Sequence, residues 1–424
     1  MSLPLFPTAD RQPLQGETSE DNPGNEVREV VEFFPTDAGV VDVIEFDSEG
    51  RLPPFPGLRR PFASIRWLIQ GAFGFASLMF MLAVIAAIPV VNFLALGYLL
   101  EVEGRVARSG RWRDGFPLLG LAPRIGSIAL GVYLWLWPLR IIGLQAAAAH
   151  IIDPGSLIDR RWQTFRLVAA IVIGLHLCFA LARGGSLGCF LRPLKNILWL
   201  TQRLWAGDYW ATASAEIRDF VSRLRLQHHF SLGVRGFGVA FAWLALPTAI
   251  YAATNQPGGG AVLLLLTGGL LLVFVFAWTP LLQARFAAEN RLRSGFELRE
   301  AFELFRHAPF AWLITIVLTY VLAFPLYAFK AYLLPQDAMW LVTLVFVLSI
   351  YPLKLITGWA YHRSQSRRER ELRSYWITRT FVRIALLFPV LGLYVTLFFF
   401  TQFLSQHGKP GMFEHHIFLL PVPF

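Results

Sequence analysis

Charged residues are scarce in this 424-residue sequence. Only 16% of its residues are Asp, Glu, Lys or Arg, and 55% are hydrophobic, whereas about a quarter of the residues in a soluble protein are charged. The apolar excess is gathered in long runs, which argues against a large soluble core and indicates membrane spans. The first 50 residues are polar and acidic, without a short apolar core behind a basic start, so we do not expect a cleavable signal peptide.

Cysteine is also rare, with Cys178 and Cys189 as the complete set. On one continuous helix these two residues would lie roughly 16 Å apart along the axis. That separation is too large for a disulfide. We therefore expect two thiols that behave as small buried apolar side chains.

Patterns typical of catalysis or metal binding are hard to find. Residues 184–188 read Gly-Gly-Ser-Leu-Gly and match the pattern of a nucleophile elbow. They lie in an apolar helical run, however, where Gly184 and Gly188 favour close helix packing instead. The histidines after residue 406 have no standard ligand spacing. We predict no catalytic residue, no metal, no cofactor and no enzymatic activity.

Long uncharged segments dominate what is present. The clearest is residues 261–284, which as a helix would rise roughly 36 Å, enough to cross a hydrocarbon core of about 30 Å. Further apolar runs cover residues 67–100, 126–152, 165–191, 231–254, 309–330, 338–361 and 380–406. The sequence therefore predicts an all-α fold, a polytopic transmembrane bundle of about seven to nine spans over residues 61–406. Residues 1–60 would form an acidic, largely disordered tail and residues 407–424 a short C-terminal tail.

Basic residues alternate between the connections. Connections 101–125, 192–230, 285–308 and 362–379 carry five, six, five and six Lys or Arg, whereas 255–260 and 331–337 carry none. Basic loops face the cytoplasm, so we expect a multi-pass protein of the inner (cytoplasmic) membrane of a bacterium, with its N-terminus in the cytoplasm. The basic residues would contact the lipid bilayer and its anionic headgroups, not nucleic acid. Residues 1–50, with 12 Asp or Glu against 2 Arg, could bind a protein partner.

Amphipathic helices are expected in two of these basic connections. Apolar residues recur at helical spacing over residues 194–205 and 214–226. Such helices are typical of the membrane interface. In the next basic connection, Ser294 and Glu297 match a capping box that would begin another helix.

The run 67–100 is too long for one perpendicular crossing and too short for two. Its 34 residues would extend roughly 51 Å as a helix, and Pro89 and Asn92 interrupt it. Because both flanks are predicted to be cytoplasmic, we expect a helical hairpin that turns near residues 88–92. The alternative is a single tilted span with the N-terminal tail exported.

A weak internal repeat relates residues 98–130 to residues 280–314. In each copy a span ends in Leu-Leu, a basic segment containing Ser-Gly follows, and Ala-Pro opens the next span. Duplicated hairpins are common in membrane folds.

Residues 97–116 resemble the motif of an uncharacterised bacterial multi-pass membrane family. There an apolar run ends in Gly-Tyr-Leu, and a basic segment and an aspartate-containing turn precede the next span. The matching residues here are Gly97, Tyr98, Leu99, Arg105, Arg108, Gly110, Asp114 and Gly115, and the likeness extends loosely over residues 80–330. The resemblance implies an integral membrane protein without an established activity and supplies no catalytic residue.

Charged side chains inside apolar runs are the main candidates for a functional site. Arg140 is the fifteenth of the 27 residues in run 126–152, where it either pairs with backbone carbonyls near Pro138 or contacts an anion or a lipid headgroup. Arg183, Lys354 and Arg383 lie toward predicted cytoplasmic ends, where their side chains could reach headgroups. No Asp or Glu falls within any run, which counts against a proton- or sodium-coupled transporter.

The sequence is compatible with two functions. The first is a non-enzymatic scaffold or assembly factor, whose acidic tail recruits a partner and whose basic loops hold anionic lipid. The second is a permease-like protein for an anionic or lipidic solute that uses Arg140.

Overall fold

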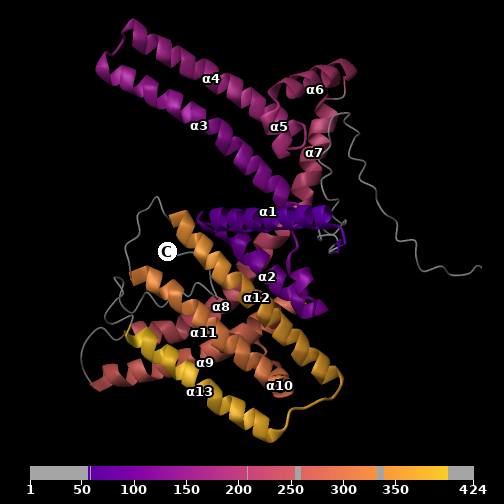
Figure 1. Ribbon diagram of the computed structural model, residues 1–424. Coiled ribbons are helices and arrows are strands. Elements are labelled where there is room, and N and C mark those ends of the chain that lie inside the picture. The colour runs from indigo at the N-terminus through magenta and orange to yellow at the C-terminus, as the bar shows by residue number, and fades with distance from the viewer. Residues whose placement is uncertain (1–55, 58, 208, 254–258, 332–338, 400–424) are drawn as a thin grey trace, which may run out of the picture. The chain divides into compact units, whose positions relative to one another are not determined.

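The computed structural model describes residues 56–57, 59–207, 209–253, 259–331 and 339–399, and every regular element in these ranges is a helix (Figure 1). Six helices are long and apolar enough to cross a membrane, and a seventh span results if the bent pair α10 (Leu298–His307) and α11 (Pro309–Ala331) counts as one. The predicted all-α polytopic fold is confirmed, with six or seven candidate spans in the described ranges. The tail 407–424 and nearly all of tail 1–60 lie outside them.

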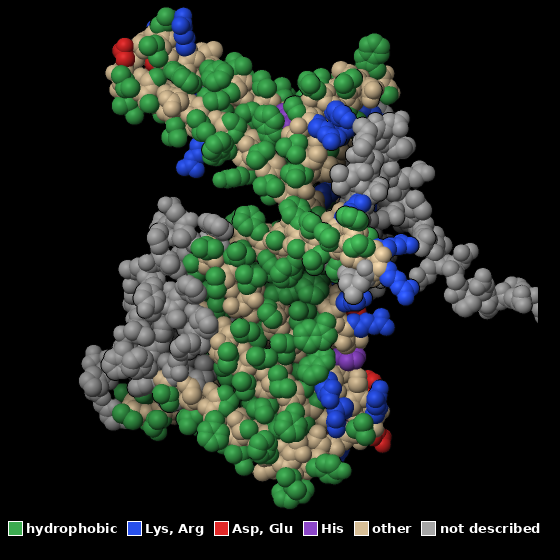
Figure 2. Space-filling view, viewed as in Figure 1, with side chains coloured by type: hydrophobic (Ala, Val, Ile, Leu, Met, Phe, Trp, Pro, Cys, Tyr) green, Lys and Arg blue, Asp and Glu red, His purple; other side chains and the backbone are tan. Residues whose placement is uncertain are grey.

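Apolar side chains cover most of the surface that Figure 2 shows for the described helices. A soluble protein would expose few contiguous apolar patches of that extent. In a membrane protein the same side chains face lipid, so this surface agrees with the spans.

The first apolar run forms two helices. α1 (Pro61–Ala86) and α2 (Asn92–Ser109) are separated by residues 87–91, where Val90 has a φ of 68°. The predicted break near residues 88–92 is confirmed. α2 also continues past the end of the apolar run at Leu100, and the charges in this extension keep it out of the set of candidate spans.

Three later helices pack closely on α2. They are α8 (Leu226–Ala252), α12 (Met339–Glu369) and α9 (Gly259–Glu289). α8 comes closest, because a β-carbon at Gly97 would overlap the backbone carbonyl of His229, and one at Gly233 would overlap that of Phe93. Small residues at such a crossing let two backbones approach within van der Waals contact.

α3 (Ala122–Ile152) and α4 (Leu157–Ala182) pack against each other (Figure 1). The run 165–191, expected as one helix, ends at Ala182, and α5 (Leu187–Leu191) follows a turn in which Gly184 has a φ of 115°. The interpretation of residues 184–188 as a packing motif inside a helix was wrong. A β-carbon at Gly184 or Gly188 would meet no atom within 4 Å, and Gly184 instead permits a backbone conformation that other residues avoid.

α6 (Pro193–Ala206) covers the first predicted amphipathic stretch, and α7 (Tyr209–Arg223) covers the second except for its last three residues. Both expose large apolar side chains, among them Leu194, Ile197, Leu198, Trp205, Trp210 and Ile217. This exposure favours the interface of the membrane, where one face of each helix would enter the headgroup region.

The backbone conformation confirms the internal repeat. The residues that correspond in the two copies differ from those paired by the shared Ser-Gly and Ala-Pro sequences. α2 and α9 each end before a left-handed residue, Gly110 with a φ of 70° and Asn290 with a φ of 53°. An extended arginine and a 3₁₀ helix follow in both copies, η1 (Trp112–Gly115) and η2 (Leu292–Phe296). A constant shift of 180 residues relates the two copies, so that Gly115 corresponds to Gly295.

The predicted capping box at Ser294 was wrong. The Ser294 hydroxyl donates to the backbone carbonyl of Arg291 over 2.6 Å, and α10 begins only at Leu298. Glu297 is held instead by an ion pair with Arg285 of α9. The preceding residues adopt the 3₁₀ helix of the repeat, which local capping rules do not reveal.

Candidate functional site

Lys354 of α12 lies buried between α2 and α9. Its ammonium nitrogen is 2.8 Å from Oε2 of Glu103 and 2.8 Å from Oε1 of Gln283. The three residues are 4%, 0% and 1% exposed, so the ion pair is shielded from solvent. The sequence analysis predicted that Lys354 could contact an anion or a lipid headgroup. In the structure the anion beside it is the Glu103 carboxylate.

Glu103 and Gln283 occupy equivalent positions in the two repeat copies. Oε1 of Glu103 is buried and accepts no hydrogen bond from a described residue. The sequence reading missed this carboxylate, because it lies just beyond the apolar run that ends at Leu100. The lack of Asp and Glu within the runs therefore did not exclude a buried acid. Gly104 lies in the same extension of α2 and packs against the backbone of Ala287, a contact that the sequence alone does not reveal.

A pair of tyrosines extends the polar contacts between α2 and α12. The Tyr351 hydroxyl donates to the backbone carbonyl of Gly115 over 2.7 Å and lies 3.3 Å from the Tyr98 hydroxyl. Because the Tyr351 proton is directed at Gly115, Tyr98 is the donor between the two hydroxyls. In the second repeat copy, the indole N–H of Trp243 donates to the carbonyl of Gly295 over 3.0 Å. Each 3₁₀ helix is thus fixed by an aromatic donor.

A second acid on α2, Glu101, lies at the edge of the helix cluster. It accepts from Nε of Arg105 over 2.8 Å and lies 3.2 Å from Nε2 of His228 and 3.7 Å from Arg108. Burial alone would raise the pKa of Glu101, but the hydrogen bonds from Arg105 and His228 hold this pKa below its usual value. The carboxylate is therefore ionised and links α2 to α8.

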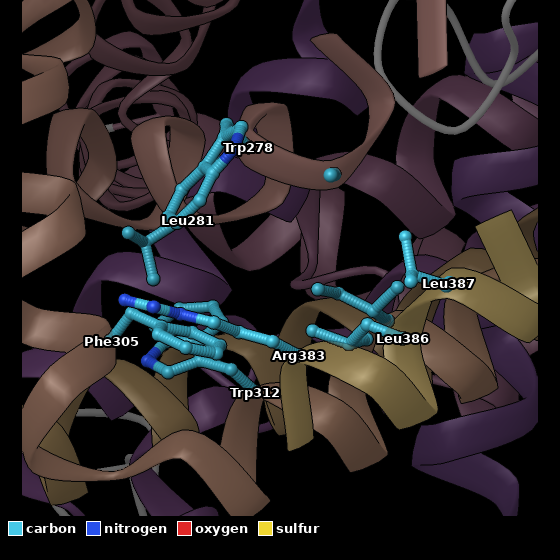
Figure 3. Close-up of a pocket in the computed structure, with 9 residues that line it drawn as sticks. Trp278, Leu281, Phe305, Trp312, Arg383, Leu386 and Leu387 are labelled. Atoms are coloured by element: carbon cyan, nitrogen blue, oxygen red, sulfur yellow. The ribbon is translucent and has the colours of Figure 1, made fainter. Parts of the chain in front are cut away.

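An aromatic cavity of about 270 Å³ lies between α9, α10, α11 and α13 (Trp376–Phe399). Its lining residues are Ala277, Trp278, Leu281, Phe305, Trp312, Ile316, Arg383, Leu386 and Leu387. Arg383 is the single charged residue in this lining. Figure 3 shows its side chain extending from α13 alongside Trp312, with the guanidinium end toward Phe305.

Two contacts of its aromatic residues fix the walls of this cavity. The indole N–H of Trp312 donates to the Ser364 hydroxyl over 2.8 Å. The ring of Trp278 lies 5.8 Å from that of Phe305. No hydrogen bond or ion pair joins Arg383 to the described part of the chain. The cavity therefore combines a preformed apolar surface with one free cationic group, which suits an amphiphilic anion.

Arg140 and Arg183 lie apart from this cavity. Arg183 directly follows α4, and its guanidinium donates to Oδ1 of Asn196 over 3.0 Å. Arg140 is exposed on α3, and nothing in the described ranges pairs with it, whether a carboxylate or a backbone carbonyl near Pro138. The structure thus shows no common site for the four cations that the sequence singled out: Arg183 binds Asn196, Lys354 binds Glu103, Arg383 lines the cavity and Arg140 is exposed on α3.

Cys178 is exposed and Cys189 is buried, and both thiols are free. The expectation of two buried thiols therefore holds for Cys189 alone. His176 turns its Nε2 to the carbonyl of Phe190 over 3.0 Å and so gives no support to a serine nucleophile at Ser186. Within the described ranges, no three His, Cys, Asp or Glu side chains form a group that could hold a metal ion.

Comparison with known proteins adds one match. Residues 211–335 match the model of a family described as a protein of unknown function (DUF4013). The match covers α8, α9, η2, α10, α11 and all but the first two residues of α7, and therefore the second repeat copy. The expected likeness to an uncharacterised family is confirmed to that extent, although residues 97–116 lie outside the match. No curated protein and no solved structure matches the chain.

Proposed function

We propose that this multi-pass membrane protein is a non-enzymatic, permease-like protein of the bacterial inner membrane that binds an amphiphilic anion. The observation that carries the proposal is the aromatic cavity lined by Arg383, whose guanidinium has no hydrogen-bond or ion-pair partner among the described residues. The anion is a phospholipid or a related lipidic solute with a phosphate or carboxylate head. Arg383 holds the head, and the apolar walls hold the first part of the tail.

The depth of Arg383 supports this orientation. It is the eighth residue of α13, roughly 10 Å from the start of the helix. The connection before α13 is one of the basic ones, which are predicted to be cytoplasmic. Leu386 and Leu387 lie about one turn further along the helix. A lipid in the cytoplasmic leaflet would present its head and tail in the same order.

The chemistry of the lining supports an anion over a neutral lipid. A guanidinium forms paired hydrogen bonds with phosphate or carboxylate, and such bonds are stronger where water is excluded. Indole rings suit the boundary between headgroups and acyl chains. A cavity of about 270 Å³ holds part of a lipid, with the remainder in the bilayer.

Binding of a defined anionic lipid tests the proposal. Full-length protein in phosphatidylcholine nanodiscs is heated with and without phosphatidylglycerol of the same chain length. We expect the anionic lipid to raise the melting temperature of the wild type, and Arg383→Leu to remove this rise. Arg379→Leu is the matched control, since Arg379 lies one turn away on α13 and does not line the cavity. Equal stabilisation of all three proteins would refute the proposal.

A scaffold or assembly factor is the second candidate. It rests on the 12 Asp or Glu against 2 Arg in residues 1–50, an acidic segment suited to a basic protein partner. Affinity purification of the full chain from native membranes, compared with a chain lacking residues 1–50, would test it. A partner retained by both forms would contradict a role for the acidic tail.

A further inference from the structure

α3 carries an exposed stripe with a charge in its middle. Tyr133, Trp137, Arg140 and Leu144 follow one another at spacings of four, three and four residues, and therefore lie on one face of the helix. Tyr133 is 67% exposed, Trp137 59% and Leu144 62%, and Arg140 is exposed between them. We call these four residues the α3 stripe.

The charge of the α3 stripe lies close to the middle of the bilayer. α3 is a candidate span of 31 residues, and the charged residues on either side of its apolar part are Arg124 and Asp153. Arg140 is 16 residues from the first and 13 from the second, roughly 24 Å and 20 Å along the axis. A hydrocarbon core of about 30 Å centred between them places Arg140 about 2 Å from the midplane.

A guanidinium at this depth requires a partner. Charged side chains near the bilayer centre are costly and are almost always paired with another charge or with backbone carbonyls. No described residue of this chain supplies such a partner for Arg140. Its neighbours in the α3 stripe are two aromatic rings and a leucine, and aromatic side chains are enriched at the cores of protein–protein interfaces.

We infer that the α3 stripe docks against a transmembrane helix of a different protein that carries Asp or Glu at mid-depth. Charge complementarity identifies this occupant, because a carboxylate neutralises Arg140 and the flanking rings exclude lipid from the pair. A second copy of this chain fits poorly. A twofold contact along the stripe would place Arg140 against Arg140.

The described helices of a second copy supply no unpaired acid at the required depth. The described candidate spans carry Asp159, Glu289 and Glu369 at helix ends. The span over residues 209–252 adds Glu216 and Asp219, both in the amphipathic helix α7, and Asp219 is paired with Arg223. The two acids of α2 are engaged by Lys354 and Arg105. The partner is therefore a different protein, and its contact does not depend on the cavity at Arg383.

Site-specific photo-crosslinking of the full-length protein in native membranes tests the inference. A benzophenone amino acid is placed at Leu144, and in the control at Leu134, which is 51% exposed but lies about a quarter turn away on α3. We expect a discrete product at Leu144 and none at Leu134. Mass spectrometry should place the cross-link on a transmembrane segment that contains Asp or Glu.

Charge variants then distinguish pairing from mere proximity. Arg140→Leu should lower the cross-link yield at Leu144 at least about tenfold, because losing one partner of a buried charge pair strongly weakens a contact. Arg140→Lys should retain most of it. Exchange of the charges, Arg140→Glu with arginine at the partner's acid, should restore the product. Melting temperatures of the purified variants check that α3 remains folded.

Several results would overturn the inference. These are the absence of any protein product at Leu144, a product with a second copy of the chain, adducts with lipid alone, equal products at Leu134 and Leu144, and a yield that Arg140→Leu leaves unchanged.

Discussion

Glu103 and Gln283 bind the same ammonium group from equivalent positions of the two repeat copies. Each places a side-chain oxygen 2.8 Å from Nζ of Lys354. The first contact joins two charges and the second joins a charge to a neutral amide. Together they connect α2, α9 and α12 at a point that solvent does not reach.

Removal of the lysine should strongly destabilise the protein. Lys354→Met leaves the Glu103 carboxylate buried without a counter-charge, and loss of one partner from a buried pair costs about 3–5 kcal/mol. Denaturant unfolding of purified protein in detergent measures the change. The double variant Lys354→Met with Glu103→Gln should recover much of the loss. A double variant as unstable as the single one would show that packing, and not charge, decides the effect.

A methyl group at the crossing of α2 and α8 should also be destabilising. Gly97→Ala forces a β-carbon into the backbone carbonyl of His229, and backbone cannot move aside as a side chain can. We expect a loss of at least about 1–3 kcal/mol. Gly174→Ala is the control, because a β-carbon on α4 there meets no atom within 4 Å. Similar melting temperatures for both variants would contradict this close approach.

Acid should weaken the contact of Glu101 with α8. The pKa of Glu101 lies below its usual value of 4.5 in the folded protein, so its contribution to stability is fully present above about pH 4.5. That contribution is lost as the pH falls through the lowered folded pKa. Glu101→Gln should therefore lower the melting temperature at pH 7, and the difference from wild type should shrink toward pH 3.5. A difference that is constant with pH would contradict the assignment.

Thiol labelling decides the orientation of the chain. Single cysteines at positions 19 and 405, in a background with Cys178→Ser and Cys189→Ser, are treated with an impermeant reagent on intact cells. If residues 67–100 form the expected hairpin and the basic loops are cytoplasmic, position 405 is labelled and position 19 is protected. Labelling of position 19 from outside would support the exported tail instead. Lysed cells provide the control for accessibility of both thiols.

The spans and the break in the first run could be predicted from sequence, because both depend on local properties. Apolar run length reports membrane crossing, and Pro89 with Asn92 marks the break between α1 and α2. The two amphipathic helices α6 and α7 were predictable for the same reason, since their apolar spacing lies within the segment itself.

The candidate sites depend on contacts between distant segments, which a single sequence does not contain. Glu103 is polar and follows an apolar run, so a hydropathy rule assigns it to a loop, and only Lys354 explains its burial. In the sequence, Arg383 is a basic residue near a helix end like several others. Its distinguishing feature is the cavity that it lines together with Trp312 and Phe305, and this is known only from the structure. The turn at Gly184 was missed because a glycine pair inside an apolar run fits helix packing equally well.

A single lysine between two equivalent positions also limits how alike the two repeat copies can be. One ammonium neutralises one carboxylate, so a second acid at position 283 would leave a net negative charge in the interior. An amide of the same size as glutamate keeps the hydrogen bond without that charge. The two repeat copies can therefore have the same backbone conformation, but positions 103 and 283 cannot both carry a carboxylate. Their divergence at positions 103 and 283 is a condition for charge neutrality where they meet.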